Sequence, residues 1–232
     1  IVVDKFINNR ELGSLILIDR VSNMTSACGQ IAEIIDNEKN LTWHEMDVTK
    51  ELRERQLSQK AFTVWMTGLS GSGKSTLANA LEKRLFTLGK HTMLLDGDNI
   101  RMGLNKNLGF NEGDRVENIR RIAEVAKLMN DAGLIVITSF ISPYSQDRQS
   151  AKEIIGDDFV EVYVSTPLDE CERRDVKGLY KEARKGNIRS FTGISSPYEI
   201  PETPDVEIDT SGKKIEDCVN TIIDKLKKYI EE

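Results

Sequence analysis

The octapeptide Gly68–Ser75, with the sequence GLSGSGKS, limits how this chain can fold more than any other feature. It has the pattern G-x-x-x-x-G-K-S, and it stands between an apolar run at residues 61–66 and a stripe of leucines. Glycines at 68, 71 and 73 let the backbone turn tightly, so that successive N–H groups point inward at a phosphate chain. A helix beginning after the loop adds the positive end of its dipole. The pattern therefore predicts a strand–loop–helix unit that holds nucleotide phosphates.

Short apolar strands alternate with amphipathic helices on either side of this unit. Strands are predicted at residues 61–66, 91–95, 134–138, 159–164 and near Val206. Helices are predicted from three apolar stripes: Leu77, Leu81, Leu85 and Leu88, closed by Gly89; Val116, Ile119, Ile122, Ala123 and Ala126, stopping at Gly133; and Ile215, Val219, Ile222 and Leu226. A further helix is predicted to start with Thr166 as N-cap, Pro167 and Asp169. This alternation predicts an α/β fold, a five-stranded parallel sheet with helices on both faces and ligands at the carboxyl ends of its strands.

Residues 1–35 follow another pattern, with the short β segments IVVDKF, SLILIDRV and ACGQIAEII. The polar residues 36–40 read as a linker. We therefore expect a β segment at 1–35, a linker and a first helix at 36–58, and a nucleotide-binding domain at 59–232. Because the chain begins in what reads as a strand, we expect it to be a piece of a longer protein.

The composition argues against two classes of partner. Acidic residues number 38 and basic residues 32, which disfavours a nucleic-acid surface. No apolar run is long enough to cross a bilayer, and no signal-peptide pattern opens the chain, so we expect no membrane contact. Three widely spaced cysteines show no metal-ligand spacing and are typical of reduced thiols in a cytoplasmic protein.

Two carboxylates next to the phosphate loop indicate chemistry. Lys74 is placed to bridge the β- and γ-phosphates, and Ser75 to ligate a magnesium ion. Asp96 and Asp98 end the second strand, where one can hold magnesium and the other can take a proton from an acceptor hydroxyl. The alternative is an acidic turn in which Asp98 caps a helix. The guanine motif N-K-x-D is incomplete in NKNL at 105–108, which favours ATP.

Basic residues further along the chain suggest an anionic acceptor. Arg101, Arg115, Arg120 and Arg121 surround Phe110, and they are suited to gripping an anion while the ring stacks on a base. A solvated helix face is the alternative for each arginine. The basic stretch 173–193 reads as a mobile lid over phosphates, or alternatively as a solvated loop.

Together these motifs resemble the adenylylsulfate (APS) kinase family from about residue 40 onward. The motifs that carry the resemblance occur in family order: WHE…RE, GLSGSGKST, DGDNIR, LGF, R…N…R, FISP, KGLYKEAR and FTGISSPYE. The resemblance implies a P-loop kinase fold and transfer of the γ-phosphate of ATP to the 3′-hydroxyl of adenosine 5′-phosphosulfate. The product would be 3′-phosphoadenylylsulfate, the activated sulfate of sulfate assimilation.

The resemblance also implies a role for each matching residue. ATP binding falls to Gly68, Leu69, Ser70, Gly71, Ser72, Gly73, Lys74, Ser75, Thr76 and Arg174, and magnesium to Ser75 and Asp96. Asp98 and Lys74 would be catalytic, with Asp98 at the acceptor hydroxyl. The remaining substrate-binding residues would be Arg101, Phe110, Arg115, Asn118, Ile141, Ser142, Lys177 and Phe191, with the adenine between the two phenylalanines. Ser142 matches a position where some members carry a phosphoserine. Val176 and Ser195 depart from the family, where many members have Pro and Asp, and they affect the expected lid.

Residues 1–35 resemble the end of the last β-barrel domain of a sulfate adenylyltransferase large subunit, through GSLILIDRVSNMTSACGQI. That resemblance implies a bifunctional protein in which sulfate adenylyltransferase subunits are fused to or associated with the kinase, and we expect a homodimer. Two alternatives remain open at this point. One is a degenerate kinase domain that binds nucleotide and regulates its fused partner, and the other is a different small-molecule kinase of the same fold.

Overall fold

The computed structural model describes residues 14–18, 25–31 and 42–230, which fall into two compact units, Ile1–Asp47 and Val48–Glu232. In the first unit, β1 (Ser14–Ile18) pairs antiparallel with β2 (Thr25–Gln30). These two strands confirm a short β segment ahead of the kinase fold. The strand predicted at residues 1–6, the end of the third β segment at 32–35 and the linker at 36–40 lie outside the described residues.

The second unit is built on a five-stranded sheet in the order β4-β5-β3-β6-β7, and every neighbouring pair is parallel. The strands are β3 (Thr63–Thr67), β4 (Thr92–Asp96), β5 (Ile135–Ser139), β6 (Phe159–Val164) and β7 (Val206–Ile208). The predicted sheet is confirmed, with strand bounds that move by one or two residues. Strands β3 and β6 pair from their first residues, Thr63 opposite Phe159, so that both end at one edge.

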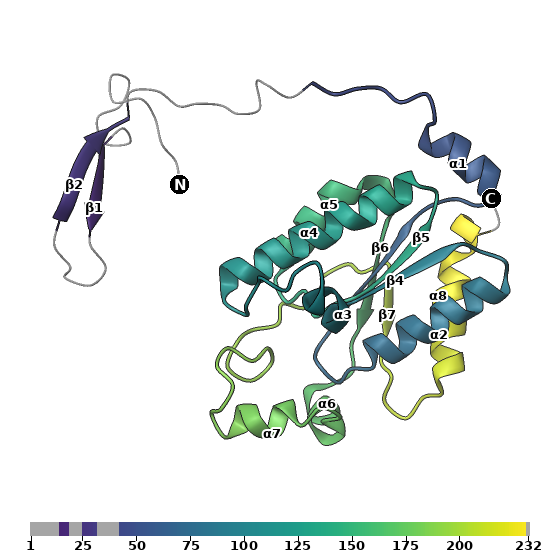
Figure 1. Ribbon diagram of the computed structural model, residues 1–232. Coiled ribbons are helices and arrows are strands. Elements are labelled where there is room, and N and C mark those ends of the chain that lie inside the picture. The colour runs from purple at the N-terminus through teal and green to yellow at the C-terminus, as the bar shows by residue number, and fades with distance from the viewer. Residues whose placement is uncertain (1–13, 19–24, 32–41, 231–232) are drawn as a thin grey trace. The chain divides into compact units, whose positions relative to one another are not determined.

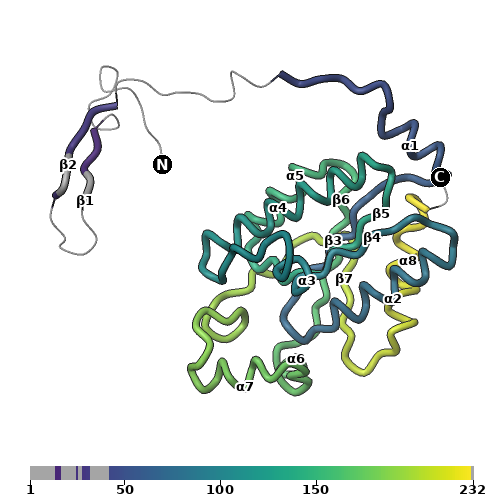
Figure 2. Tube along the Cα trace, in the orientation of Figure 1, coloured from purple at the N-terminus to yellow at the C-terminus, as the bar shows by residue number. Residues whose placement is uncertain are grey.

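Helices cover both faces of this sheet. Helices α2 (Lys74–Thr87) and α8 (Ile215–Ile230) lie on one face, and α4 (Glu112–Asp131) and α5 (Ser145–Ile155) lie on the other (Figure 1). Three short helices gather at the carboxyl edge of the strands: α3 (Gly97–Met102), α6 (Leu168–Arg174) and α7 (Leu179–Arg184) (Figure 2). The remaining helical segments are α1 (Lys50–Leu57) and the 3-10 turn η2 (Gly156–Asp158). Of the helices within the described ranges, none is both long and apolar enough to pass through a membrane.

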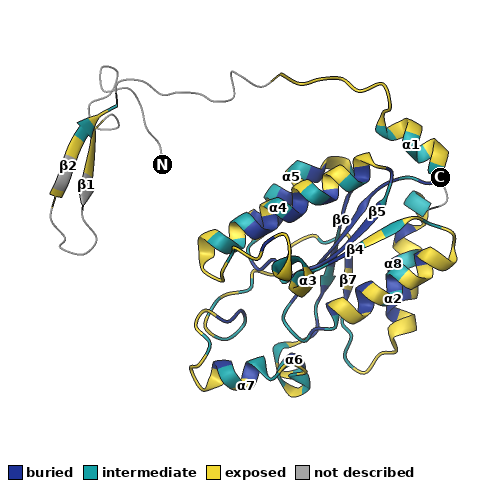
Figure 3. Ribbon diagram, in the orientation of Figure 1, coloured by how far each residue is buried: buried dark blue, intermediate teal, exposed yellow. Residues whose placement is uncertain are grey.

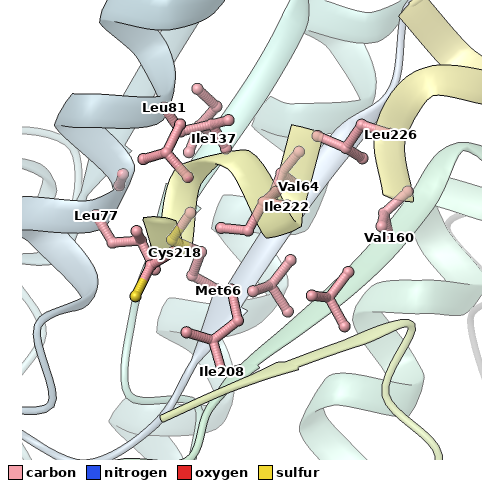
Figure 4. Close-up of a cluster of buried hydrophobic side chains, with 14 of the residues drawn as sticks. Val64, Met66, Leu77, Leu81, Ile137, Val160, Ile208, Cys218, Ile222 and Leu226 are labelled. Carbon is pink, nitrogen blue, oxygen red and sulfur yellow. The ribbon is translucent and has the colours of Figure 1, made fainter. Parts of the chain in front are cut away.

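The neighbouring strands β3 and β5 are buried on both faces, as the helix layers require, whereas the edge strand β4 is partly exposed (Figure 3). Alternate residues of β3 enter different clusters, because successive strand side chains point to opposite faces. Val64 and Met66 pack with Leu81 and Ile222 under α2 and α8 (Figure 4), whereas Trp65 packs among the apolar residues of α4 and α5. Each face therefore has its own apolar layer, and β3 anchors both.

Three predictions about helix faces and ends were wrong. Leu88 is exposed and lies one position after α2 ends, and Gly89 closes the turn with a φ of 76°. Val116 lies in the first turns of α4, ahead of the part that packs on the sheet, and is exposed. Thr166 is not the N-cap of α6, because Pro167 holds that position and no side chain caps the helix. The Thr166 hydroxyl instead donates to the phosphate loop, at Ser72 O.

The buried position of Ile222 gives a test of how α8 is attached. Ile222 is fully buried (0 % exposed) in the cluster between α8 and the sheet. We expect Ile222→Ala to lower the free energy of unfolding by about 2–5 kcal/mol, through lost burial and the cavity that remains. Ile215→Ala in the same helix, where the side chain is 45 % exposed, is the matched control and should cost well under half as much. Urea unfolding of both variants measures the difference, and equal costs would contradict the packing of α8.

Candidate active site

The phosphate loop has a backbone that glycine alone adopts easily. Gly68, Gly71 and Gly73 have φ values of 147°, 76° and 99°, in the left-handed region that side chains disfavour. A Cβ on Gly68 would lie 2.6 Å from the Val164 carbonyl oxygen. Helix α2 begins directly after Gly73 without a side-chain cap, so the N–H groups of its first turn are left for another acceptor.

Five consecutive carbonyl groups of this loop, those of residues 68–72, accept hydrogen bonds from surrounding side chains. The donors are Lys74 to Gly68 O (2.9 Å) and Leu69 O (2.7 Å), Tyr180 to Ser70 O (2.8 Å), Arg174 to Gly71 O (3.4 Å), and Thr166 and Thr210 to Ser72 O (3.0 and 2.9 Å). The carbonyls of residues 70–72 are thereby bonded to side chains outside the loop, and those of residues 68 and 69 to the loop's own lysine. Such a loop presents its N–H groups to an anion, which is the arrangement that phosphate binding needs.

Lys74 is the buried cation of the loop. Its ammonium group is held by two loop carbonyls, and Asp96, Asp98 and Lys177 are close enough to influence its charge. Burial lowers the pKa of Lys74 to about 8, which is well below the usual value for lysine. The site therefore keeps a cation in a poorly solvated place, where an incoming phosphate would stabilise it.

Ser75 and Asp96 provide oxygen ligands at the start of α2 and the end of β4. The Ser75 hydroxyl donates to Asp96 Oδ2 at 2.8 Å and lies 3.1 Å from the Ser139 hydroxyl. Hard oxygen groups of this kind fit magnesium, which is commonly held by one or two carboxylates together with substrate phosphates. No group of three His, Cys, Asp or Glu residues suited to a metal occurs within the part of the chain that the structure describes.

Asp98 is an exposed residue in the first turn of α3, and it forms an ion pair with Lys177 of the lid. The interpretation of Asp98 as a helix cap is wrong, because Asp96 is the N-cap of α3 and its Oδ1 accepts from the Asp98 N–H at 3.0 Å. Asp96 thus faces Ser75 with one oxygen and fixes Asp98 with the other. The Asp98 carboxylate takes no part in this cap. It pairs with Lys177 and remains exposed at the carboxyl edge of the sheet.

Two arginines converge beside Phe110. The Arg101 guanidinium lies 4.5 Å from the centre of the Phe110 ring and donates to Gly109 O at 2.8 Å. Arg115 donates to Phe110 O (2.9 Å) and, across to the lid, to Thr192 Oγ1 (2.8 Å). Burial and then the charge of Arg115 lower the pKa of Arg101. The two positive charges repel each other, and an anion bound between them would relieve this repulsion.

The other two arginines of this region are used differently. Arg120 and Arg121 both donate to Glu117, at 2.8 and 2.7 Å, along the surface of α4. For Arg120 this is the solvated helix face that was the alternative interpretation. Arg121 also donates to Asn107 Oδ1 at 2.9 Å, in the segment that follows α3. Of the set, Arg101 and Arg115 are the two that contact Phe110.

The two phenylalanines predicted to flank an adenine lie in different surroundings. Phe110 is 66 % exposed, whereas Phe191 is 9 % exposed and meets Tyr180 edge to face, with ring centroids 5.0 Å apart. Arg115 joins their segments, because it donates to the carbonyls of Phe110 and Ser190. The segments are therefore adjacent, and the adenine sandwich itself stays a prediction.

Three further predicted site residues make hydrogen bonds to other residues of the chain. Asn118 is buried and accepts from Asn105 Nδ2 at 3.0 Å. The Ile141 carbonyl accepts from Thr67 at 2.7 Å, and the buried Ser142 hydroxyl accepts from the Trp65 indole N–H at 3.2 Å. Ser142 also has a φ of 37°, which marks a constrained turn after β5. A buried, bonded hydroxyl gives no support to phosphorylation of Ser142, which stays untested.

Sequence reasoning missed the residues that hold the phosphate loop from outside. Thr166 was interpreted as a helix cap, and neither Tyr180 nor Thr210 was assigned a role. Thr210 also bonds Arg174, whose guanidinium donates to its hydroxyl at 2.8 Å. No periodicity marks Thr210, because it lies in an irregular segment after β7. Its contact with Ser72 spans 138 residues.

This fold and site define a class: nucleotide-dependent phosphotransferases with a phosphate loop at the carboxyl edge of a parallel sheet. The family model for adenylylsulphate kinase matches residues 60–209, well over half of the chain. The chain belongs to the adenylylsulphate kinase family.

Relatives with assigned names agree with this assignment. An adenylyl-sulfate kinase of Clostridium kluyveri is 53% identical over 193 residues, which are 83% of this chain and 97% of that protein. The bifunctional enzyme NodQ of Rhizobium tropici is 54% identical over 233 residues, covering 100% of this chain and 37% of NodQ. This chain thus spans about a third of the length of its bifunctional relatives.

A solved structure shares the fold. The APS kinase CysC of Mycobacterium tuberculosis, in complex with AMPPNP and APS, superposes with a TM-score of 0.70 at 47% sequence identity. The match covers 73% of this chain and 99% of CysC. The five-stranded P-loop kinase fold is therefore shared with an APS kinase of known structure.

The lowered pKa of Lys74 predicts how stability depends on pH. Between about pH 8 and pH 10.5 the unfolded chain keeps a proton on Lys74 that the folded protein has lost. The contribution of Lys74 to the free energy of unfolding therefore increases with pH in this range. Below pH 8 the burial penalty on the charged form is fully present. We expect the free energy of unfolding of the wild type, minus that of Lys74→Met, to increase from pH 7.5 to pH 9.5.

Urea unfolding without nucleotide at the two pH values measures this difference. Lys83→Met, at an exposed lysine of the same helix, is the matched control. A difference for Lys74→Met that is flat or falls with pH would contradict the burial of a destabilised ammonium group.

Proposed function

We propose that this chain transfers the γ-phosphate of ATP to the 3′-hydroxyl of adenosine 5′-phosphosulfate, giving 3′-phosphoadenylylsulfate. The observation that carries the proposal is the meeting of two sets of residues at one sheet edge. One is a phosphate loop with its carbonyls bonded outward, and the other is the Asp98, Arg101 and Arg115 group beside Phe110. Membership of the adenylylsulphate kinase family supports the choice of acceptor.

ATP would bind with its phosphates in the loop and its base outside α2. A pocket of about 220 Å³ adjoins the loop here, lined by Gly73, Thr76, Leu77, Arg174, Thr210, Lys213, Ile215 and Cys218. Arg174 is fixed on its far side by Glu170, to which it donates at 2.8 Å. Its planar guanidinium is thus held beside the pocket, ready to lie against a flat base.

Ser75 and Asp96 would hold the magnesium ion that accompanies ATP, and the ion supplies charge neutralisation at the β- and γ-phosphates. Lys74 would bridge the same phosphates, since its ammonium lies at the base of the loop. Its charge offsets the negative charge that develops on the transferred group. A fixed cation needs no reorganisation during the reaction, which is the basis of its contribution.

The acceptor would lie on the other side, toward α3 and the lid. Asp98 would accept the proton of the 3′-hydroxyl as it attacks the γ-phosphorus, and the ion pair with Lys177 would orient this carboxylate. Arg101 and Arg115 would bind the phosphosulfate, with Phe110 and Phe191 on the adenine. Asn118, Ile141 and Ser142 would shape the floor of the acceptor site through the buried contacts described above.

The test of this function is ATP-dependent turnover with purified protein. Adenylylsulfate is offered as acceptor with AMP as control, and formation of 3′-phosphoadenylylsulfate and ADP is followed. Turnover with adenylylsulfate and not with AMP supports the proposal. Nucleotide binding without turnover would instead favour a regulatory kinase domain that has lost catalysis.

Asp98→Asn tests the proposed proton acceptor. An amide keeps the shape and cannot take the proton, so we expect turnover to fall by roughly a hundredfold or more. ATP binding, measured by calorimetry, should stay close to that of the wild type, because Asp98 lies outside the phosphate loop. Loss of turnover in Asp96→Asn together with normal turnover in Asp98→Asn would show that the two roles are reversed.

Phe110→Ala tests the acceptor pocket. Stacking on one aromatic ring contributes about 1–3 kcal/mol per base, so we expect the KM for adenylylsulfate to rise by about tenfold or more. The KM for ATP should change little, because its site uses a separate loop. Steady-state kinetics with each substrate varied in turn give both values. A defect confined to ATP would mean that the two nucleotide sites are exchanged.

We further propose that the chain is the kinase part of a bifunctional protein, with a sulfate adenylyltransferase fused or associated. The NodQ of Rhizobium tropici aligns over all of this chain, including residues 1–35, which supports this. A division into a β segment at 1–35, a linker and helix at 36–58 and the kinase at 59–232 stays a prediction, as do a homodimer and a cytoplasmic location. Sedimentation equilibrium of the purified protein tests the dimer.

A further inference from the structure

Arg148 is a buried cation beside the turn that follows β5. It lies near the start of α5 and is 4 % exposed. Its guanidinium pairs with Glu161 of β6, with 3.0 Å between Nε and Oε1. A buried ion pair of this kind contributes little net stability compared with apolar side chains of similar volume. Stability alone therefore does not account for this arginine.

The same guanidinium also bonds two main-chain carbonyl groups. Nη1 donates to Ser142 O at 2.9 Å, and Nη2 donates to Glu199 O at 2.7 Å. The ring of Tyr198 lies against the group, with its centre 5.8 Å from the guanidinium carbon. A planar fork can serve one carboxylate and two carbonyls together, whereas the compact ammonium of lysine cannot reproduce that geometry. The arrangement therefore requires arginine in particular.

The turn at Ile141 and Ser142 is held through its carbonyl groups. Ile141 O accepts from Thr67 Oγ1 at 2.7 Å, and Ser142 O accepts from Arg148 at 2.9 Å and from Thr67 Oγ1 at 3.3 Å. Ser142 has a φ of 37°, in the left-handed region that a residue with a Cβ adopts at a conformational cost. Arg148 is the charged donor among these bonds, and charged donors make the stronger hydrogen bonds. Arg148 thus helps to hold Ser142 in a conformation that the residue disfavours by itself.

We propose that Arg148 is a positioning residue for the acceptor, because it fixes the Ser142 turn against which adenylylsulfate binds. This inference rests on the proposed function, which puts Ile141 and Ser142 at the floor of the acceptor site. When the turn is fixed in advance, its ordering does not have to be supplied by the binding of the acceptor. The three acceptors of Arg148 all lie outside the phosphate loop, so affinity for ATP should depend little on this residue.

Steady-state kinetics of Arg148→Lys test the proposal, with adenylylsulfate and ATP each varied in turn. Lysine keeps the positive charge near Glu161 and loses the fork, so the bond to the Ser142 carbonyl is lost. We expect the KM for adenylylsulfate to rise by about tenfold or more, the usual effect of losing a hydrogen bond from a charged donor. The KM for ATP should change little. This difference between the two KM values is the readout.

Ile155→Ala is the matched control for a loss of stability. Ile155 is the last residue of α5, and it is buried in the apolar layer beneath that helix. Its truncation destabilises the same helix and leaves the bonds of the Ser142 turn in place, so both KM values should match the wild type. Thermal unfolding shows which variants are folded at the assay temperature.

A double variant separates positioning from stability. Arg148→Met together with Glu161→Gln removes both charges, so no unpaired charge stays buried and the fold is expected to persist. Neither new side chain restores the fork beneath Ser142. The KM for adenylylsulfate should therefore remain raised, with the KM for ATP close to that of the wild type. This variant decides the question if Arg148→Lys is not folded.

The outcomes distinguish this inference from the proposed function. A wild-type protein without turnover on adenylylsulfate would overturn both. With an active wild type, three results would overturn the positioning role alone: an unchanged KM for adenylylsulfate in the folded arginine variants, an equal rise in both KM values, or the same kinetic defect in Ile155→Ala.

Discussion

The outward bonding of the carbonyl groups of residues 68–72 is the constraint on which the rest of the site depends. A peptide group has a donor and an acceptor on opposite sides, so each carbonyl that bonds outward turns an N–H toward the other side. Lys74 of the loop itself donates to the carbonyls of residues 68 and 69. The donors to the other three come from distant parts of the chain: Thr166 after β6, Arg174 and Tyr180 in the lid, and Thr210 after β7. The loop is therefore shaped by the whole carboxyl edge of the sheet, and its glycines permit a conformation that these donors select.

The sheet supplies the donors because its strands are parallel and in register. β3, β4 and β6 end at one edge, where their loops place Lys74, Asp96 and Thr166 around the phosphate loop. Two separate apolar layers hold β3 rigidly, through Val64 and Met66 on one face and Trp65 on the other. The position of the phosphate loop therefore depends on the packing of β3, the strand that precedes it.

Much of the fold could be predicted from the sequence, because local patterns determine strands, helices and the phosphate loop. Contacts between residues far apart in the chain could not be predicted in this way. The spacing of apolar residues and of glycines reports on local structure, so the five strands and the loop at Gly68–Ser75 could be predicted. The prediction that Leu88 belongs to the buried stripe of α2 was wrong, because the helix ends one residue earlier. The Asp98–Lys177 pair joins residues 79 positions apart, and nothing local marks either as the other's partner. Phe191 likewise reads as part of a polar lid, and its burial depends on Tyr180 and Leu69, which only the folded chain brings to it.

The apolar cluster that Phe191 forms with Tyr180 and Leu69 has a consequence for how such an enzyme can diverge. Leu69 belongs to the phosphate loop and Phe191 to the proposed acceptor site, yet both are packed in one cluster. A substitution selected for a new acceptor would disturb the packing behind the phosphate loop, and a compensating change would have to arise nearby. Acceptor choice and nucleotide affinity are therefore not independent traits in this fold, and lineages that change one are constrained to change the lid as a unit.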